Sequence, residues 1–314
     1  MKRRLTVQAL VRRYLVQQRA LGYELRFYDT PLLDFGRFAD RQANGLPITT
    51  DLAVRWATQT DAAATHRAKR LSLVRNFARF CCAYDPRTEV PPDGFLGPSP
   101  GRIKPHIYSR AQIRALIASA RRLKPVFSPL RPFTYEALIG LLSVTGLRRS
   151  EVLRLRLADF DANAGTLRIS PSKFAPERLL PLHRSTVCAL KRYLVRRRQM
   201  APFGEHLFVG HRGQPIPAGS LQQTFRLLVH DLSGNGARPR PRIHDLRHSF
   251  ATQHVAAWSR QAAPLAHRLL LLSRYMGHRH FHDTWWYVSS DAHALRAASE
   301  RFDRFRYGRH FLER

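Results

Sequence analysis

The sequence is short of acidic side chains and, among its basic residues, short of lysine. Its 314 residues include 53 Lys and Arg but only 22 Asp and Glu, which gives a formal net charge of +31, and only six of the basic residues are lysines. Solubility requires far less charge than this, so the excess predicts a polyanionic partner. An RNA-binding protein of ribosomal type fits the same charge, and an arginine-rich genome bias accounts for part of it.

Cysteine is also scarce, and long apolar runs are missing. The three cysteines, Cys81, Cys82 and Cys188, lack zinc-type spacing, and they are typical of core residues in a reducing compartment. No apolar run approaches the ~20 residues that a membrane span needs, and the basic start of the chain leads into an amphipathic pattern without a cleavage site. We therefore expect a cytoplasmic protein with no membrane partner.

Helical periodicity dominates the first part of the chain. Apolar residues recur at helical spacing in residues 7–15, residues 30–31 and 49–50 are typical helix starts, and a longer helical pattern covers about residues 62–84. These features predict an all-helical domain over residues 1–90.

One side of the longest of these helices is basic. Such a side is either a solvated surface or a contact for a nucleic-acid backbone, and the overall charge favours the second interpretation. The basic side chains are Arg67, Lys69, Arg70, Arg75 and Arg79.

A segment rich in proline and glycine divides the chain. It predicts a linker over residues 91–107, followed by a second domain over residues 108–314. In that domain, residues 132–144 have a helical pattern that ends before a glycine, and residues 166–170 and 178–182 have the pattern of a β-hairpin. Helices resume after it, so the predicted fold class is mainly α, with two domains and a small β-hairpin or sheet.

Four separated segments of the second domain stand out. They are TGLRRSE at 145–151, SKFAPERLLPL at 172–182, HDLRHSFAT at 244–252 and MGHRHFHDTWWY at 276–287. Together, and in this order, they resemble the motifs of the tyrosine recombinase (phage integrase) family. The family pattern is an Arg after a T-G-L turn, a Lys in a β-hairpin, an H-x-L-R-H box, and a G-H followed nine residues later by Tyr.

The resemblance implies a role for each matching residue. Two arginines would clamp a phosphate, a hairpin lysine and two histidines would assist catalysis, a tyrosine would be the nucleophile, and a glutamate would support the first arginine. In that order they are Arg148 and Arg247, Lys173, His244 and His278, Tyr287, and Glu151.

The proposed chemistry needs these types of residue. Two guanidiniums can stabilise the charge that develops on the nonbridging oxygens of a phosphodiester under attack. A tyrosine with an ordinary pKa of ~10 needs a base, here His244, and His278 would donate a hydrogen bond to the phosphate. Lys173 among the guanidiniums could protonate the leaving 5′-oxygen. The product would be a 3′-phosphotyrosine, formed without cofactor, metal or ATP.

The resemblance also implies an assembly. We expect a compact, Xer-like or transposon-type recombinase whose two domains clamp double-stranded DNA in the bacterial nucleoid. In the family, four protomers assemble on two DNA sites, in some cases with partner recombinases. The sequence does not distinguish integration, excision, dimer resolution and transposition.

Two other interpretations stay open. The chain could be an accessory protein that keeps the fold and binds DNA without catalysis. Alternatively, the H-x-H-x-H run of His278, His280 and His282 could belong to a metal site of a nuclease, although no Cys or carboxylate set accompanies it. The sequence also departs from the family in the long stretch between HDLRHSFAT and MGH, which contains Pro264. It departs again at residues 283–286, which replace the small polar residues that the family usually has before its tyrosine.

Overall fold

The structure is a computed structural model. It describes residues 6–23, 25, 28–43, 45, 47–97, 104–126, 128–171, 176–233, 241–261, 265–289 and 296. The chain divides into two units, Met1–Ile103 and Lys104–Arg314, and each is described by itself. None of the described helices combines the length and the apolar character needed to cross a bilayer.

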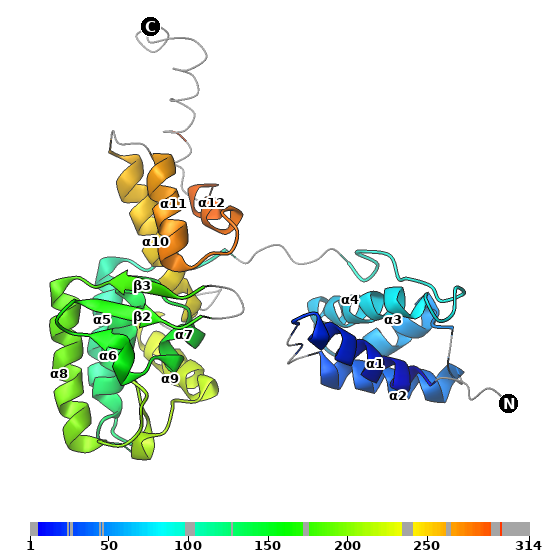
Figure 1. Cartoon of the computed structure of the whole chain (residues 1–314), viewed down its shortest axis with the longest axis horizontal. Coiled ribbons are helices and arrows are strands. Elements are labelled where there is room, and N and C mark those ends of the chain that lie inside the picture. Colours follow the sequence, from blue (N-terminus) through cyan, green and yellow to red (C-terminus); the bar gives the residue numbers. More distant parts are fainter. Residues whose placement is uncertain are drawn as a thin grey trace, which may run out of the picture. The chain divides into compact units, whose positions relative to one another are not determined.

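The regular secondary structure in the described residues of the first unit is all helical, as the periodicity predicts. Its helices are α1 (Val7–Ala20), α2 (Asp29–Ala43), α3 (Thr50–Thr58) and α4 (Ala64–Cys81) (Figure 1). The side chains of Thr6 and Thr49 cap α1 and α3 by accepting hydrogen bonds from backbone N–H groups of the first turn. Phe35 packs edge-on against Trp56 and Phe77, with ring centroids 5.3 and 6.3 Å apart, and these rings form the centre of the core.

The second unit begins with three helices and a small sheet. The helices are α5 (Arg110–Arg121), α6 (Arg131–Thr145) and α7 (Arg149–Arg154), and a 3₁₀ turn (Leu157–Asp159) precedes the strands. Strands β1 (Phe160–Asp161), β2 (Thr166–Ile169) and β3 (Arg178–Pro181) form an antiparallel sheet in the order β1-β2-β3. The predicted hairpin is therefore confirmed, and the two-residue strand β1 extends it. Leu167 and Leu180 are paired across β2 and β3, and both are buried.

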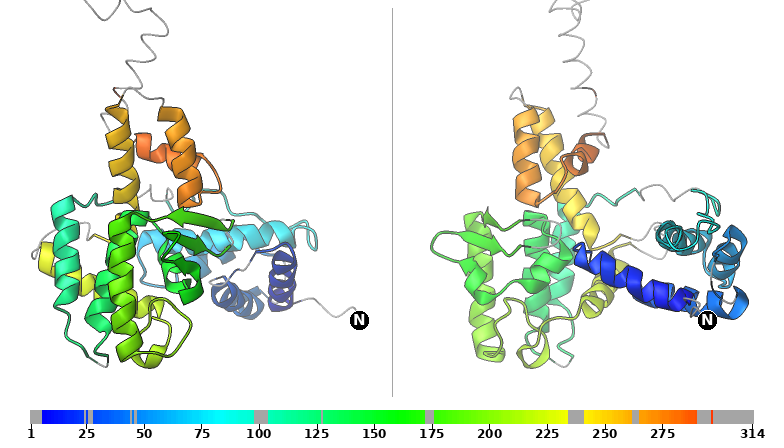
Figure 2. Two further views of the ribbon diagram at one scale, coloured as in Figure 1. Left: turned by 60° about the vertical axis from the view of Figure 1, so that its left-hand side comes forward. Right: turned by 45° about the vertical axis from the view of Figure 1, so that its right-hand side comes forward.

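The rest of the second unit is again mainly helical. It consists of α8 (Arg184–Met200), a 3₁₀ turn (His211–Gly213), α9 (Ala218–Ser233), α10 (His244–Ser259), α11 (Leu265–Met276) and α12 (His282–Ser289). Helix α6 packs against α5, α8 and α10. Helices α10, α11 and α12 lie beside one another in both views of Figure 2 and share a separate apolar cluster around Val255, Leu269 and Met276. The mainly α fold with a small sheet is as predicted.

The end of α6 sets the direction of the chain into α7. Gly146 ends α6 in the left-handed region at φ +60°, and a Cβ atom there would lie 2.6 Å from the ring of Phe250 on α10. Glycine is thus required for two reasons: the backbone has a positive φ, and the Phe250 ring leaves no room for a side chain. The turn places Arg148 at the N-cap of α7, next to α10.

Candidate active site

Arg148 is held at the start of α7 by Glu151. The Glu151 carboxylate accepts a hydrogen bond from the Arg148 backbone N–H at 2.8 Å and from its guanidinium at 3.1 Å. The other terminal nitrogen of Arg148 donates to the carbonyl of Gly277, after α11, at 2.8 Å. The Arg148 side chain is still 23% exposed, so it can also meet a bound molecule.

Arg247 on α10 is almost fully buried beside the same two turns. Its terminal nitrogens donate to the carbonyls of Gly146 at 2.6 Å and Met276 at 2.9 Å. Burial lowers its pKa to about 10, and the neighbouring charge of Arg148 acts in the same direction. A pKa of about 10 still leaves Arg247 charged at neutral pH. The ends of α6 and α11 therefore bring two guanidiniums together.

Tyr287 on α12 lies beside these arginines. Its side chain is only 3% exposed, and its ring stacks on the ring of His278 with centroids 6.2 Å apart. Burial raises the pKa of the Tyr287 hydroxyl, while the charge of Arg247, a hydrogen bond with Arg247 and the charge of Arg148 oppose that rise. The structure thus brings Tyr287, Arg148, Arg247 and His278 into one cluster.

His244 and His278 are both neutral in this environment. Desolvation lowers the pKa of His244 to about 4, with the nearby His248 and Arg247 acting in the same direction, although the residue keeps an exposed edge. Burial also lowers the pKa of His278 to about 3, with Arg247 and Arg148 acting the same way. Nδ1 of His278 lies 2.6 Å from the hydroxyl of the fully buried Thr284, and this contact fixes the orientation of the ring.

Arg178, which the sequence motifs did not indicate, belongs to the same cluster. Arg178 on β3 donates two hydrogen bonds to Glu151, at 3.2 and 3.0 Å, and a third to the carbonyl of Tyr275 at 2.9 Å. Burial raises the pKa of Glu151, but the hydrogen bonds and charges of Arg178 and Arg148 outweigh it, so the pKa lies below its usual value. Glu151 is therefore an ionised carboxylate shared by two arginines. The available signal in the sequence was an arginine at the start of an otherwise apolar strand.

His248 is a second residue that the sequence analysis did not select. Its ring is edge-on to His244 with centroids 4.7 Å apart, and it lies 5.3 Å from the ring of Trp286 and 5.7 Å from that of Tyr287. It therefore fills the space between the first turn of α10 and α12. The H-x-L-R-H box contains it, one residue after Arg247.

Two expectations concern residues outside this cluster. Lys173 lies outside the described residues, so its position stays a prediction. His280 and His282 are exposed, and within the described parts of the chain no group of three or more His, Cys, Asp or Glu side chains is arranged to hold a metal ion.

The basic side of α4 differs in part from the prediction. Arg75 is buried, and its guanidinium donates to the carbonyls of Pro91 and Pro92 and pairs with Asp93, so the expectation that it lies on an exposed face is wrong. Arg70 stacks over Trp56 at 3.8 Å, and Arg67 donates to the carbonyl of Thr60. Lys69 and Arg79 are exposed.

Comparison with known proteins points to one family. Residues 109–293 match the Phage integrase family. The chain is 39% identical over 308 residues to a Sinorhizobium fredii protein named integrase/recombinase y4rB, covering 95% of this chain and 98% of that protein. It is 28% identical over 261 residues to the tyrosine recombinase XerD of Xanthomonas axonopodis pv. citri, over 78% and 82% of the two chains. The fold matches a structure of the Tn1549 transposon integrase in complex with transposon right end DNA, with a TM-score of 0.68 at 19% identity, over 95% and 99% of the chains.

Proposed function

This chain belongs to the phage integrase family of tyrosine recombinases, and from that premise we propose that it cuts and rejoins DNA at specific sites through a 3′-phosphotyrosine intermediate. The observation that carries the proposal is the cluster of Tyr287 with Arg247, Arg148 and His278. It combines a nucleophile with the positive charge that a phosphodiester requires.

Strand cleavage begins with the nucleophile. The Tyr287 hydroxyl oxygen attacks the phosphorus, a bond forms between them, and the bond from phosphorus to the 5′-oxygen breaks. Arg148 and Arg247 donate hydrogen bonds to the two nonbridging oxygens, whose negative charge grows in the transition state. Because both guanidiniums are held by backbone carbonyls before DNA binds, little reorganisation is needed.

Protons must move in both directions during this step. Neutral His244 accepts the proton of the Tyr287 hydroxyl, directly or through water. In this mechanism the Thr284 hydroxyl donates to Nδ1 of neutral His278, so the ring proton is on Nε2 and is donated to a phosphate oxygen. Lys173 supplies a proton to the leaving 5′-oxygen.

The covalent intermediate explains how strands are rejoined. A phosphotyrosine conserves the energy of the broken phosphodiester bond, so a 5′-hydroxyl from another strand can attack it and release Tyr287. This exchange consumes no nucleotide. The substrate is double-stranded DNA at the ends of a mobile element, with the outcome of integration, excision or transposition.

Binding and assembly follow from the charge and the family. The net charge of +31 favours association with the DNA backbone, and exposed Lys69 and Arg79 of α4 are the first-unit side chains that we assign to it. We further propose that four protomers assemble on two DNA sites, with or without a partner recombinase.

A suicide-substrate assay tests the proposal. The full chain is incubated with nicked duplexes that span the ends of its host element, and covalent protein–DNA adducts are separated under denaturing conditions. We expect an adduct with the unmodified protein and with Tyr84→Phe, which alters a tyrosine outside the cluster, and none with Tyr287→Phe. Tight binding without any adduct on these duplexes would instead support the accessory-protein alternative.

A further inference from the structure

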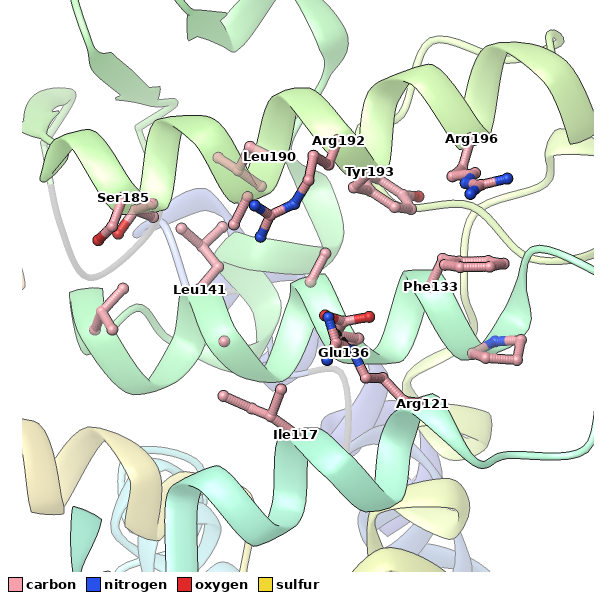
Figure 3. A pocket seen from close by; sticks show the side chains of 16 residues that line it. Ile117, Arg121, Phe133, Glu136, Leu141, Ser185, Leu190, Arg192, Tyr193 and Arg196 are labelled. Carbon is pink, nitrogen blue, oxygen red and sulfur yellow. Dashed lines mark ion pairs between the residues drawn. The ribbon is translucent and has the colours of Figure 1, made fainter. Parts of the chain in front are cut away.

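A groove of about 580 Å³ lies between α6 and α8, with α5 at its side (Figure 3). Its floor consists of small or apolar side chains, which include Ala137, Gly140 and Leu141 of α6 and Ala189 of α8. Because several of these side chains are so short, the two helices pack together and still leave a trough between them. The groove therefore results from small residues in both helices.

The side of α6 that lines the groove is apolar and partly exposed. Leu138 and Leu142 fill the core on one side of α6, while Ala137, Gly140 and Val144 face the groove on the other, where Val144 is 48% exposed. Helix α6 therefore has apolar residues on both sides. A helix of this kind is normally covered all round, so its groove side is suited to a partner.

The border of the groove is positively charged. Arg121 of α5 pairs with Glu136 of α6 at 2.8 Å, so that pair is neutral. Arg192 and Arg196 point from α8 into the groove, and Arg196 lies over the ring of Phe133 at 5.4 Å (Figure 3). Among the described residues, no carboxylate forms an ion pair with either arginine. An apolar floor with two unneutralised guanidiniums is complementary to apolar side chains flanked by acidic ones.

We propose that this groove binds an acidic amphipathic helix of a partner protein. Bulky apolar side chains at helical spacing would fill the trough, and Asp or Glu beside them would pair with Arg192 and Arg196. A second copy of this chain is a poor source of such a helix because the chain carries a net charge of +31.

DNA fits the groove less well than an acidic helix does. DNA-binding surfaces are polar, whereas this floor is apolar. The residues that line the groove include none of Arg148, Arg247 and Tyr287 of the candidate active site. The inference goes beyond the proposed recombinase function and does not depend on it.

Peptide binding to the full chain tests the inference. The probe is a fluorescent 16-residue helical peptide with Leu at helical spacing and Glu beside the leucines, and its control has Lys in place of every Glu. By fluorescence anisotropy we expect saturable binding of the acidic peptide with a Kd in the range of about 1–100 μM and at least tenfold weaker binding of the control.

Paired charge reversals on α8 locate the binding. Arg192→Glu with Arg196→Glu should weaken binding at least tenfold. Lys191→Glu with Arg198→Glu makes the same charge change at two residues of α8 that do not line the groove, and it should alter binding less than threefold. Equal loss in both double variants, equal binding of both peptides, or no saturable binding would overturn the inference. The inference would also be overturned if duplex DNA displaced the peptide equally from the unmodified protein and from the Tyr287→Phe variant. That result would identify the groove as a DNA-binding surface.

Discussion

At the scale of single residues, the candidate site depends on charges that support one another. Glu151 is buried between Arg148 and Arg178, and each arginine also donates to a carbonyl at the end of α11, at Gly277 or Tyr275. A buried carboxylate with two cationic partners is stable only while both partners remain. The residue that sequence motifs did not select, Arg178, is therefore as important to the arrangement as those that they did.

Replacement of Arg178 tests this dependence. Arg178→Met should lower the free energy of unfolding of the second unit by about 3–5 kcal/mol, because it leaves the Glu151 carboxylate with one partner. Strand cleavage should fall by about 10²-fold through misplacement of Arg148. Chemical denaturation and the adduct assay measure the two effects, and Arg178→Lys should recover part of both. Full activity and stability in Arg178→Met would show that Glu151 does not need it.

The lowered pKa values of His244 and His278 predict how stability changes with pH. The pKa values of His244 and His278 are lowered to about 4 and about 3, whereas in the unfolded chain they return to ~6.5. Between these limits the unfolded state binds more protons, so stability is highest above about pH 6.5 and falls as the pH decreases toward 4. The half-buried His278 contributes a slope of at most about 1.4 kcal/mol per pH unit in that range, and the exposed His244 contributes less because solvent screens its charge.

Urea unfolding of His278→Gln between pH 7 and pH 4 measures this contribution. The variant should show a shallower decrease in the free energy of unfolding than the unmodified protein. Replacement of the exposed His282 by Gln is the control and should leave the slope unchanged. The same slope in all three proteins would contradict the burial of a neutral His278.

At the scale of helices and turns, the junction of α6 and α7 is the critical connection. Gly146→Ala places a methyl group against the Phe250 ring in addition to straining a positive φ, while Gly22→Ala strains a φ of +87° with no atom within 4 Å of the new Cβ. We expect Gly22→Ala to cost about 1 kcal/mol and Gly146→Ala at least about 1 kcal/mol more. Thermal unfolding compares them, and only Gly146→Ala should also reduce cleavage. Equal effects would mean that Phe250 simply moves aside.

Helix α4 contains a buried arginine, Arg75, and an exposed one, Arg79, whose substitutions can be compared. Arg75→Ala removes hydrogen bonds to Pro91 and Pro92 and an ion pair with Asp93, so we expect the first unit to lose about 1–3 kcal/mol of stability. Arg79→Ala should change stability by less than about 0.5 kcal/mol, but reduce the slope of log K for DNA against log salt by about 0.9. Fluorescence anisotropy at several salt concentrations measures the slope. An unchanged slope in Arg79→Ala would remove this residue from the DNA contact.

These elements show what the sequence could and could not predict. The helices and the β2–β3 hairpin follow from local periodicity and capping residues, so they were predictable. Strand β1 has only two residues, too few to show a pattern. Arg75 was misplaced because residues 91–93, which bury it, are distant in sequence, and periodicity carries no information about such contacts. Arg178 escaped selection because its partners Glu151 and Tyr275 are distant as well.

At the scale of the whole molecule, charge and chemistry point to the same substrate. A basic chain of the phage integrase family combines a general attraction for DNA with one buried tyrosine beside two arginines. The electrostatic attraction for the DNA backbone does not depend on the DNA sequence. The specificity of the reaction must therefore come from contacts with base edges or from DNA shape. In the proposed mechanism, the chemical step needs only one phosphodiester at Tyr287.

The most direct test of the central claim is to identify the amino acid that carries the DNA. The covalent adduct is digested with protease and nuclease, and mass spectrometry locates the residue that keeps the nucleotide. The account predicts a nucleotide attached through its 3′-phosphate to Tyr287 and to no other residue. Attachment at another residue, or through a 5′-phosphate, would contradict it.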